Sequence, residues 1–392
     1  MLVHDNIMKY VTEHLKQQEI IGTSPFTFST DLKLNQNRSR GIIRIVHKVK
    51  LYLNFASIII LWLQLLHESN APLMISLKST LYAVGVTVAC VTKWNVEKQS
   101  PAFVELSNLL LQFERRQITG QEGKTLLVKP EKRLIKLVIS IGMVSAPVIV
   151  PAYILEWWIT PCTSATIGYF LFPECRLENL HHVRWSLSSK ISLFITCIVC
   201  IWVYLDSFGT YIFNCTTMSF SQCYALKSYT KFFMRKLCNS SDRKTLLIYR
   251  QLQLLNRYYN RIQQDVLVIA VLYITTAAFV IGNYALITLG RDAKVHELFL
   301  FVSTSADTFM TNIVYFGVLA KVYTNSEDAI GSVKEKLKGM KEERRKKWAR
   351  KYLRSLAPLK VAVGSVNYVD QLTPFHLFNF YIDQTVNLLL MQ

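Results

Sequence analysis

The sequence lacks the short motifs that mark most soluble enzymes. Its 392 residues contain no H-E-x-x-H metal motif, no nucleophile elbow, no phosphate-binding loop and no glycine-rich nucleotide turn. The 14 glycines and 10 prolines do not gather into a linker, and there is no repeat or low-complexity tract. These absences argue against an enzyme and against domains on flexible linkers, so we expect a single domain over residues 1–392.

Cysteine is too scattered to build a chemical site. Of eight cysteines, Cys162 and Cys175 share a loop that we expect outside the cell, where oxidising conditions permit a disulfide between them. Cys197 and Cys200 form a C-x-x-C inside an apolar segment, without a second pair of ligands. We therefore expect no metal site and no cofactor.

Acidic side chains are scarce. The sequence has 26 Asp and Glu against 45 Lys and Arg, which gives a net charge of +19. Such an excess is typical of proteins that bind nucleic acid or anionic membranes. Here the bases are spread over several loops and form no patch interleaved with stacking aromatic residues. We expect contact with anionic membrane lipid and no nucleic-acid partner.

Long apolar segments dominate what is present, and 51% of the residues are hydrophobic. Seven segments come near the ~20 residues that cross a ~30 Å hydrocarbon core. They are Leu51–Leu66, Pro72–Val91, Leu134–Trp158, Ile191–Phe213, Val266–Gly290, Leu298–Ala320 and Leu372–Gln392. The sequence thus predicts an all-α integral membrane protein with seven transmembrane helices. They do not divide into two similar halves, which argues against an inverted-repeat transporter.

The basic residues fix the expected orientation. Of the Lys and Arg between the apolar segments, 35 lie in residues 1–49, 93–133, 215–262 and 323–357, and only four lie in the other loops. By the positive-inside rule the N-terminus is cytoplasmic and the C-terminus extracellular. This orientation is the reverse of that of a G-protein-coupled receptor, and it makes residues 93–133 and 215–262 cytoplasmic.

Both of those long loops carry helical periodicity, so we expect helices to extend well past the bilayer into the cytosol. Residues 332–354 are amphipathic and densely basic, as in a helix that lies on anionic lipid or packs with its equivalents in other subunits. Residues 356–371 read as an irregular or extended connection. We expect residues 332–392 to combine a cytoplasmic anchor helix with the last span.

Four spans carry a charged residue at membrane depth, away from the ends of the span, namely Lys78, Asp206, Asp307 and Asp383. One account pairs Lys78 with an acid and satisfies the others internally. The other places Asp307 in a ligand cavity, because hydroxyl side chains accompany it on one helix and aromatic side chains lie on the outer halves of spans two to four. This candidate ligand site comprises Tyr82, Tyr153, Trp157, Phe194, Thr304, Asp307 and Thr308. The aromatic residues near Trp157 have an alternative explanation, because aromatic side chains at this depth also form belts at the membrane–water interface.

The last span is the most polar of the seven. At 100° per residue, one stripe holds His376, Asn379, Asp383 and Asn387, and nearly opposite lie Thr385, Leu388, Leu389 and Gln392. A helix that is polar on two sides is unsuited to lipid on either. We expect it to lie between neighbouring helices and a water-filled path.

The topology and the tail together resemble the insect chemoreceptor superfamily of gustatory and odorant receptors. In gustatory members the tail carries Thr-Tyr, five apolar residues and Gln-Phe. Here Thr385 and Gln392 match in register, while Val386 replaces Tyr, Asn387 enters the apolar run, and the sequence stops before the Phe. By this motif the chain is closer to the gustatory receptors.

The resemblance implies a receptor of small molecules that is a ligand-gated, non-selective cation channel in the plasma membrane of chemosensory cells. Four identical or related subunits would surround one pore for permeant cations, lined by the last span at Thr385, Leu389 and Gln392. It implies taste reception through the tail motif. An odorant receptor subunit, and a metabotropic seven-span receptor with inverted topology, are the alternatives.

Overall fold

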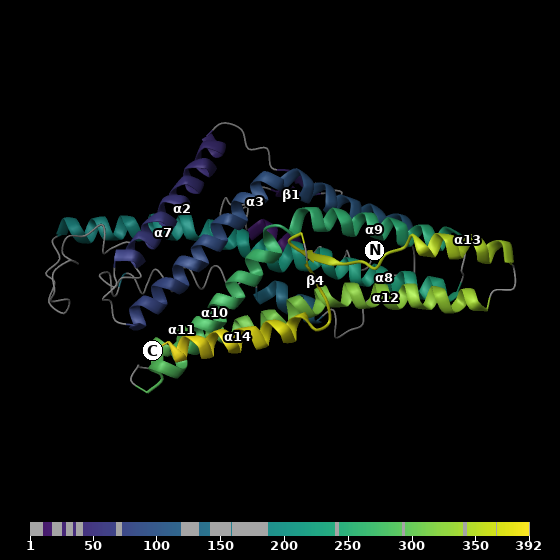
Figure 1. The fold of residues 1–392 in the computed structure, drawn as a ribbon. Coiled ribbons are helices and arrows are strands. Elements are labelled where there is room, and N and C mark those ends of the chain that lie inside the picture. The colour runs from purple at the N-terminus through teal and green to yellow at the C-terminus, as the bar shows by residue number, and fades with distance from the viewer. Residues whose placement is uncertain are drawn as a thin grey trace.

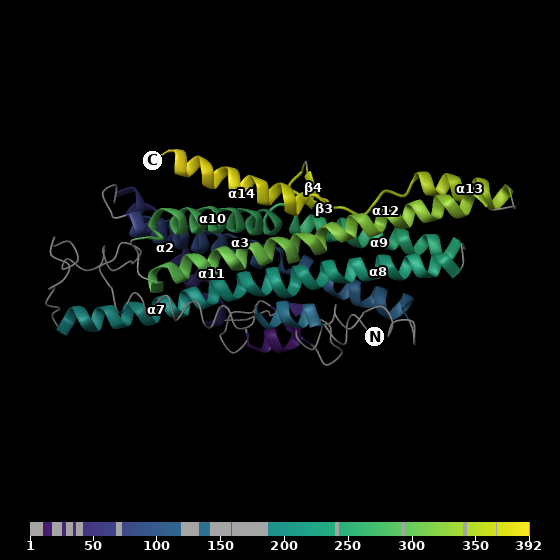
Figure 2. The ribbon, with the colours of Figure 1, turned by 90° about the horizontal axis from the view of Figure 1, so that it is seen from below.

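The structure is a computed structural model that describes most of the chain. The described residues are 11–17, 26–28, 34–36, 42–67, 73–118, 133–141, 158, 187–239, 243–291, 295–339, 343–365 and 367–391. They form long helices that run lengthwise through an elongated molecule, with the C-terminus near one end and α13 at the other (Figures 1 and 2). The third expected span, Leu134–Trp158, lies mostly outside the described residues.

The helices at the end that carries the C-terminus are the apolar ones. They are α2 (Ile42–His67), the first half of α3 (Leu73–Gln117), α7 (Leu187–Ile212), α10 (Leu267–Leu289), α11 (Val295–Thr311) and α14 (Thr373–Leu390). Within the described residues, three helical runs are long and apolar enough to cross a membrane: α3, residues 187–236 and α10. The all-helical membrane fold agrees with the sequence analysis, and seven spans stay a prediction.

The other end is built from helices that continue out of the membrane helices. The π-helical segment η3 (Phe213–Ser219) joins α7 to α8 (Phe220–Asn239), and η4 (Asn312–Phe316) joins α11 to α12 (Gly317–Lys338). Between α8 and α10 lies α9 (Arg243–Gln263). The helices thus continue past the apolar segments, as expected, and α3 itself runs on past Pro101 to Gln117. The position of this end in the cytosol stays a prediction.

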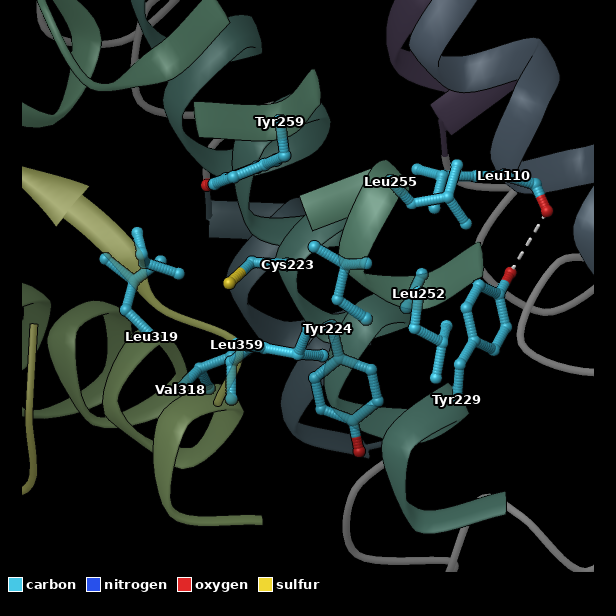
Figure 3. Packing of buried hydrophobic residues seen from close by; sticks show 14 of the residues in the cluster. Leu110, Cys223, Tyr224, Tyr229, Leu252, Leu255, Tyr259, Val318, Leu319 and Leu359 are labelled. Atoms are coloured by element: carbon cyan, nitrogen blue, oxygen red, sulfur yellow. Dashed lines mark hydrogen bonds between the residues drawn. The ribbon is translucent and has the colours of Figure 1, made fainter. Parts of the chain in front are cut away.

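One apolar core fills this end, which we expect in the cytoplasm, and Figure 3 shows part of it. Helices α3, α8, α9 and α12 bury Leu110, Tyr229, Leu252 and Leu319 in a single cluster. The Tyr229 hydroxyl donates to the Leu110 carbonyl oxygen at 3.5 Å and to Glu114 Oε2 at 3.2 Å. The burial of so many large apolar side chains is the main source of stability in a core of this kind.

Residues 332–354 are not the single helix that their pattern indicates. Helix α12 ends at Lys338, and α13 (Glu343–Arg354) packs back against it (Figure 2). Both helices contribute to the same core, α12 through Val333 and Leu337 and α13 through Ala349 and Leu353. One straight helix of this length is unable to bring both pairs to one core, so the chain turns after its C-cap at Gly339.

Two short hairpins complete the described fold. Strands β1 (Phe26–Phe28) and β2 (Leu34–Gln36) pair antiparallel, as do β3 (Val361–Val363) and β4 (Asn367–Val369). Gly364 turns the second hairpin with φ +59°, a conformation that L side chains rarely adopt. The expected connection at 356–371 is thus extended. Asn256 and Asn260 donate their amides to the Lys360 carbonyl oxygen, which fixes the hairpin to α9 just before α14.

Candidate functional site

The structure places the aromatic residues of the expected ligand site in two settings. Tyr82 on α3 is half-buried and packs on the apolar cluster between α2, α3 and α7. Phe194 on α7 is exposed, and its ring meets the ring of Trp158 edge-on, with centroids 6.0 Å apart. Tyr153 and Trp157 lie outside the described residues.

The polar part of the expected ligand site lies on α11. The Thr308 hydroxyl is buried and donates to the Thr304 carbonyl oxygen at 2.7 Å, while Thr304 donates in turn to Leu300 at 2.6 Å. Asp307 is exposed on the surface of the single chain. Both hydroxyls are thus satisfied within the helix, and the carboxylate of Asp307 is the group that is left to meet a ligand or a neighbouring subunit.

Helix α10 lies between the two parts, because it packs on both α3 and α11. Its contact with α11 is close at Gly282, where an added Cβ would come within 2.3 Å of Ser305 Oγ. Small residues permit such an approach between membrane helices. The structure therefore fixes Asp307 relative to α10, and it leaves a shared cavity with Tyr82 and Phe194 as a prediction.

Helix α14 turns one side to its own subunit. Thr385 is only 6% exposed, and its hydroxyl donates to the Tyr381 carbonyl oxygen at 2.8 Å. The Tyr381 hydroxyl lies 3.2 Å from Thr275 Oγ1 on α10, and the rings of Phe279 and Tyr381 are 5.3 Å apart. Of the three residues expected at the pore, Thr385 thus faces α10, Leu389 is half-buried and Gln392 lies outside the described residues.

The opposite side of α14 is free. Its four polar residues, His376, Asn379, Asp383 and Asn387, are all exposed in the single chain. At membrane depth a free carboxylate or amide needs water or a protein partner. This polar stripe therefore requires either a water-filled path or a second subunit beside it.

A buried ion pair joins α3 to α7. Lys93 Nζ donates to Asp206 Oδ2, and both side chains are almost completely buried. Lys50 of α2 adds a second buried cation, 4.4 Å from the ring centre of Trp202 on α7. The sequence marked Asp206 as a charge at membrane depth but counted Lys93 among the cytoplasmic bases. A charge at the border of a span is the signal that would have found this partner.

The two π-helical segments meet where the membrane helices leave the apolar region. Ser219, the last residue of η3, is fully buried, and its hydroxyl lies 3.0 Å from the Tyr315 hydroxyl of η4 and 3.0 Å from the Tyr259 hydroxyl of α9. Asn312, which begins η4, donates its amide to the Pro374 carbonyl oxygen at 3.3 Å, in the first turn of α14. We call this set, Ser219, Tyr259, Asn312 and Tyr315, the junction.

The junction joins the helix of Asp307 to the last helix. Asp307 is five residues before Asn312 on one continuous helical run. Through the Asn312 amide that run holds the start of α14. π-Helical turns are rare in proteins, and those that occur often lie at functional sites. No local residue pattern predicts such turns, so neither segment is expected from the sequence.

Within the described part of the chain, no group of three His, Cys, Asp or Glu side chains is placed to hold a metal ion. Cys197 and Cys200 are buried in α7. Burial raises the pKa of the Cys223 thiol in the cytoplasmic core to about 12, so it stays protonated. Cys162 and Cys175 lie outside the described residues.

Comparison with solved structures identifies the fold. The insect olfactory receptor OR5 from Machilis hrabei in complex with eugenol superposes with a TM-score of 0.72 over 99% of this chain and 100% of that chain, at 14% sequence identity. The chain has the fold of the insect olfactory receptors. A second structure of OR5 from Machilis hrabei gives a TM-score of 0.67 at 11% identity, and covers 98% of both chains. No family model matches the sequence, and no curated protein matches it.

Proposed function

We propose that the chain is a chemosensory receptor of the insect chemoreceptor superfamily and forms a ligand-gated, non-selective cation channel in the plasma membrane. The observation that carries this proposal is the olfactory receptor fold over 99% of the chain, seen in a receptor solved with the small molecule eugenol. The distribution of bases independently supports a cytoplasmic N-terminus. Catalysis has no part in this function.

The free stripe of α14 supports a multi-subunit channel. A carboxylate and two amides on one exposed helix face are costly against lipid, and four copies around an axis would give them water or each other. In this proposal Leu389 and Gln392 line the narrow part of the path near the outer end. Thr385 lies below them on the side of α14 that faces α10, where Tyr381 meets Thr275, and its hydroxyl bonds within its own helix.

The junction supplies a route from ligand to pore. A small molecule beside Asp307 and Thr304 would act on α11, and α11 continues through η4 to Asn312, which holds the first turn of α14. A carboxylate in the pocket favours a ligand with hydrogen-bond donors or positive charge. With the gustatory tail motif, this favours a polar tastant. The eugenol complex of the olfactory neighbour keeps an odorant as the second candidate.

The direct test is current in cells that express only this chain. We expect an agonist from a panel of polar tastants or phenolic odorants to open a cation current within milliseconds, without soluble nucleotides in the pipette. A response that needs guanine nucleotides, or solute uptake without current, would exclude the channel. Tags at Met1 and after Gln392 should be reached by antibody from inside and outside, respectively.

Variants on α11 and α14 test the two sites. Asp307→Ala should raise the agonist concentration for half-maximal response with surface expression intact, whereas Ser303→Ala, an exposed hydroxyl on the same helix, should not. Expression that collapses with Asp307→Ala would assign Asp307 a structural role. At the pore, Leu389→Ser should raise current without agonist, and Leu390→Ser, at 80% exposure, should not.

Cysteine substitution tests the register of α14. A cysteine at Leu389 should react with a thiol reagent from outside when the channel is open, and one at Thr385 should stay protected. The native Cys90, Cys197, Cys200, Cys215 and Cys223 are buried and should react little. Stronger reaction at Asp383 and Asn387 than at Leu389 would assign the pore to the free stripe.

A further inference from the structure

The last helix begins at a short joint that its own side chains hold. Strand β4 ends at Val369 and α14 begins at Thr373, so residues 370–372 form this joint. Figure 1 shows β4 at the start of α14. Because the joint is only three residues long, its geometry sets the direction in which α14 leaves the hairpin.

The hairpin before the joint is fixed to the helices around it. Val361 and Val369 are partners across the two strands, and both are fully buried. The Lys360 ammonium lies 3.9 Å from the ring centre of Tyr368, and the ring of Tyr368 is 5.1 Å from that of Tyr323 on α12. With the amides of α9 on the Lys360 carbonyl oxygen, the hairpin is tied to both α9 and α12. The joint therefore starts from a rigid support.

Asp370 closes the joint through hydrogen bonds that run both ways. Its Oδ1 accepts the backbone N–H groups of Leu372 at 3.1 Å and Thr373 at 2.8 Å, and the Thr373 hydroxyl at 2.7 Å. In return, Thr373 Oγ1 accepts the backbone N–H of Asp370 at 2.9 Å. The N–H groups at a helix start have no partner within the helix, so this reciprocal cap satisfies donors that the first turn leaves open.

The carboxylate of Asp370 stays ionised in this setting. The hydrogen bond from the Thr373 side chain, above all, holds the pKa of Asp370 below its usual range. A negative charge is also favoured at a helix N-terminus by the helix dipole. All three bonds end on one oxygen, Oδ1, so a side chain that offers a single acceptor, such as Asn or Ser, is able to replace most of the cap.

The first turn of α14 is thus held from two directions. On one side the Asn312 amide of η4 donates to the Pro374 carbonyl oxygen at 3.3 Å, and on the other side Asp370 binds the turn to the hairpin. A rigid turn passes a displacement of Asn312 on to the rest of α14. A frayed turn absorbs it, because its residues change their backbone angles before the helix moves. The cap therefore decides how much of a movement at the junction reaches Leu389.

We propose that Asp370 is a positioning residue for the pore helix, which it makes rigid at the first turn so that movement of the junction is passed on to the pore. It acts through Thr373 and needs no contact with the ligand. The inference rests on the proposed channel for its readout in current, and a second readout is independent of current.

The first test measures full-length variants in cells, with the agonist found for the wild type among the tastants and odorants. Asp370→Ala should raise the agonist concentration for half-maximal current about fivefold, the factor that corresponds to the ~1 kcal/mol of a typical N-cap. Asp370→Asn and Asp370→Ser should stay within about twofold of the wild type. Asp328→Ala on α12 removes an equally negative, exposed side chain and should leave the response unchanged. An equal shift in Asp328→Ala, or no recovery with Asn and Ser, would overturn the proposal.

Variants of Thr373 test whether Asp370 acts through it. Thr373→Val removes the hydroxyl and should shift the response in the same direction as Asp370→Ala, whereas Thr373→Ser should not. Because both changes break one set of bonds, Asp370→Ala with Thr373→Val should resemble Asp370→Ala alone. Shifts that multiply would contradict a shared cap. If Asp370→Ala fails to reach the cell surface, Thr373→Val carries the same test.

The second readout is a distance within the purified full chain. Spin labels attached through Leu254→Cys on α9 and Leu390→Cys at the far end of α14, both exposed positions, report the direction of α14 relative to the helix that holds the hairpin. Native cysteines outside the buried ones are replaced by serine, and labelled chains are diluted with unlabelled ones. The distance distribution should be clearly wider in Asp370→Ala than in the wild type or Asp370→Asn. An unchanged width would show that other contacts hold α14 without the cap.

The two readouts separate the inference from the proposed function. Wild-type cells without agonist current would contradict the channel, and the label distances would still decide whether Asp370 positions α14. Agonist current with equal responses in Asp370→Ala and the wild type would contradict the positioning role and leave the channel standing. A wide distribution in Asp370→Ala with an unchanged agonist response would assign Asp370 a structural role only.

Discussion

The membrane half and the cytoplasmic half of the chain bury different kinds of side chain. In the membrane half, apolar residues such as Phe194, Ile195 and Ile198 point outward, and between the helices lie an ion pair and the close approach at Gly282. In the cytoplasmic half, Phe233, Tyr249 and Tyr259 are fully buried. Lipid is as apolar as leucine and drives no burial between helices, so polar contacts and close packing must hold the membrane half.

The largest effect is expected from breaking the ion pair. Asp206→Ala leaves the buried Lys93 ammonium without its partner, which should cost about 3–5 kcal/mol of unfolding free energy. The measurement is the thermal unfolding of the detergent-purified protein. The double variant Lys93→Met with Asp206→Leu should be more stable than Asp206→Ala. If both behave alike, the charge pair is not what joins α3 to α7.

A cavity in the cytoplasmic core should cost somewhat less. Leu252 of α9 is completely buried in the cluster of Figure 3, and Leu252→Ala should lower stability by about 3 kcal/mol through the lost contacts and the residual cavity. Leu254→Ala on the same helix is the control, because Leu254 is 55% exposed. Similar losses for both variants would contradict an apolar core of the kind found in soluble proteins at this end.

Acidity should weaken the cytoplasmic half through His14. Its ring is 1% exposed and lies 2.6 Å from Thr217 Oγ1 of η3, and burial lowers its pKa to about 4. The unfolded chain takes up this proton near pH 6.5, so stability is complete above that pH and falls between about 6.5 and 4, by up to about 3 kcal/mol. Unfolding of the wild type and of His14→Asn should therefore differ in slope with pH across this range. Parallel slopes would show that His14 does not titrate in the core.

The smallest effect on stability concerns the junction between the halves. Ser219→Ala removes the hydroxyl that Tyr259 and Tyr315 share, which should cost about 1–2 kcal/mol. If the junction carries the signal, the agonist concentration for half-maximal current should shift as well. Ser355→Ala, an exposed hydroxyl that bonds to Tyr352 in its own helix end, is the control for both readouts.

The sequence predicts well what is encoded locally. Apolar runs located α3, α7, α10 and α14, and periodicity located α8 and α9, because one-sided burial repeats every turn. The Lys93–Asp206 pair is not predicted from the sequence, because the two residues are 113 positions apart and local spacing does not indicate a contact over that distance. The break between α12 and α13 is not predicted either, because the basic amphipathic pattern continues through Gly339. Only the position of the core, which both helices contact, requires the chain to turn there. The face of α14 that meets α10 depends on Tyr381 finding Thr275, which again is a tertiary choice.

The paired π-helical segments give this architecture an unusual tolerance in register. Each hydrogen bond in such a segment spans one more residue than in an α-helix. The wider turns of η3 and η4 therefore hold one extra residue each. If the wider turn moves along the helix, each residue that it passes rotates by roughly 100° about the helix axis, and the helix stays intact. Deleting one residue within 213–219 or 312–316 should therefore return the segment to an α-helix and leave the flanking helices in place. Among distant relatives of this chain, single-residue gaps should gather at these two places.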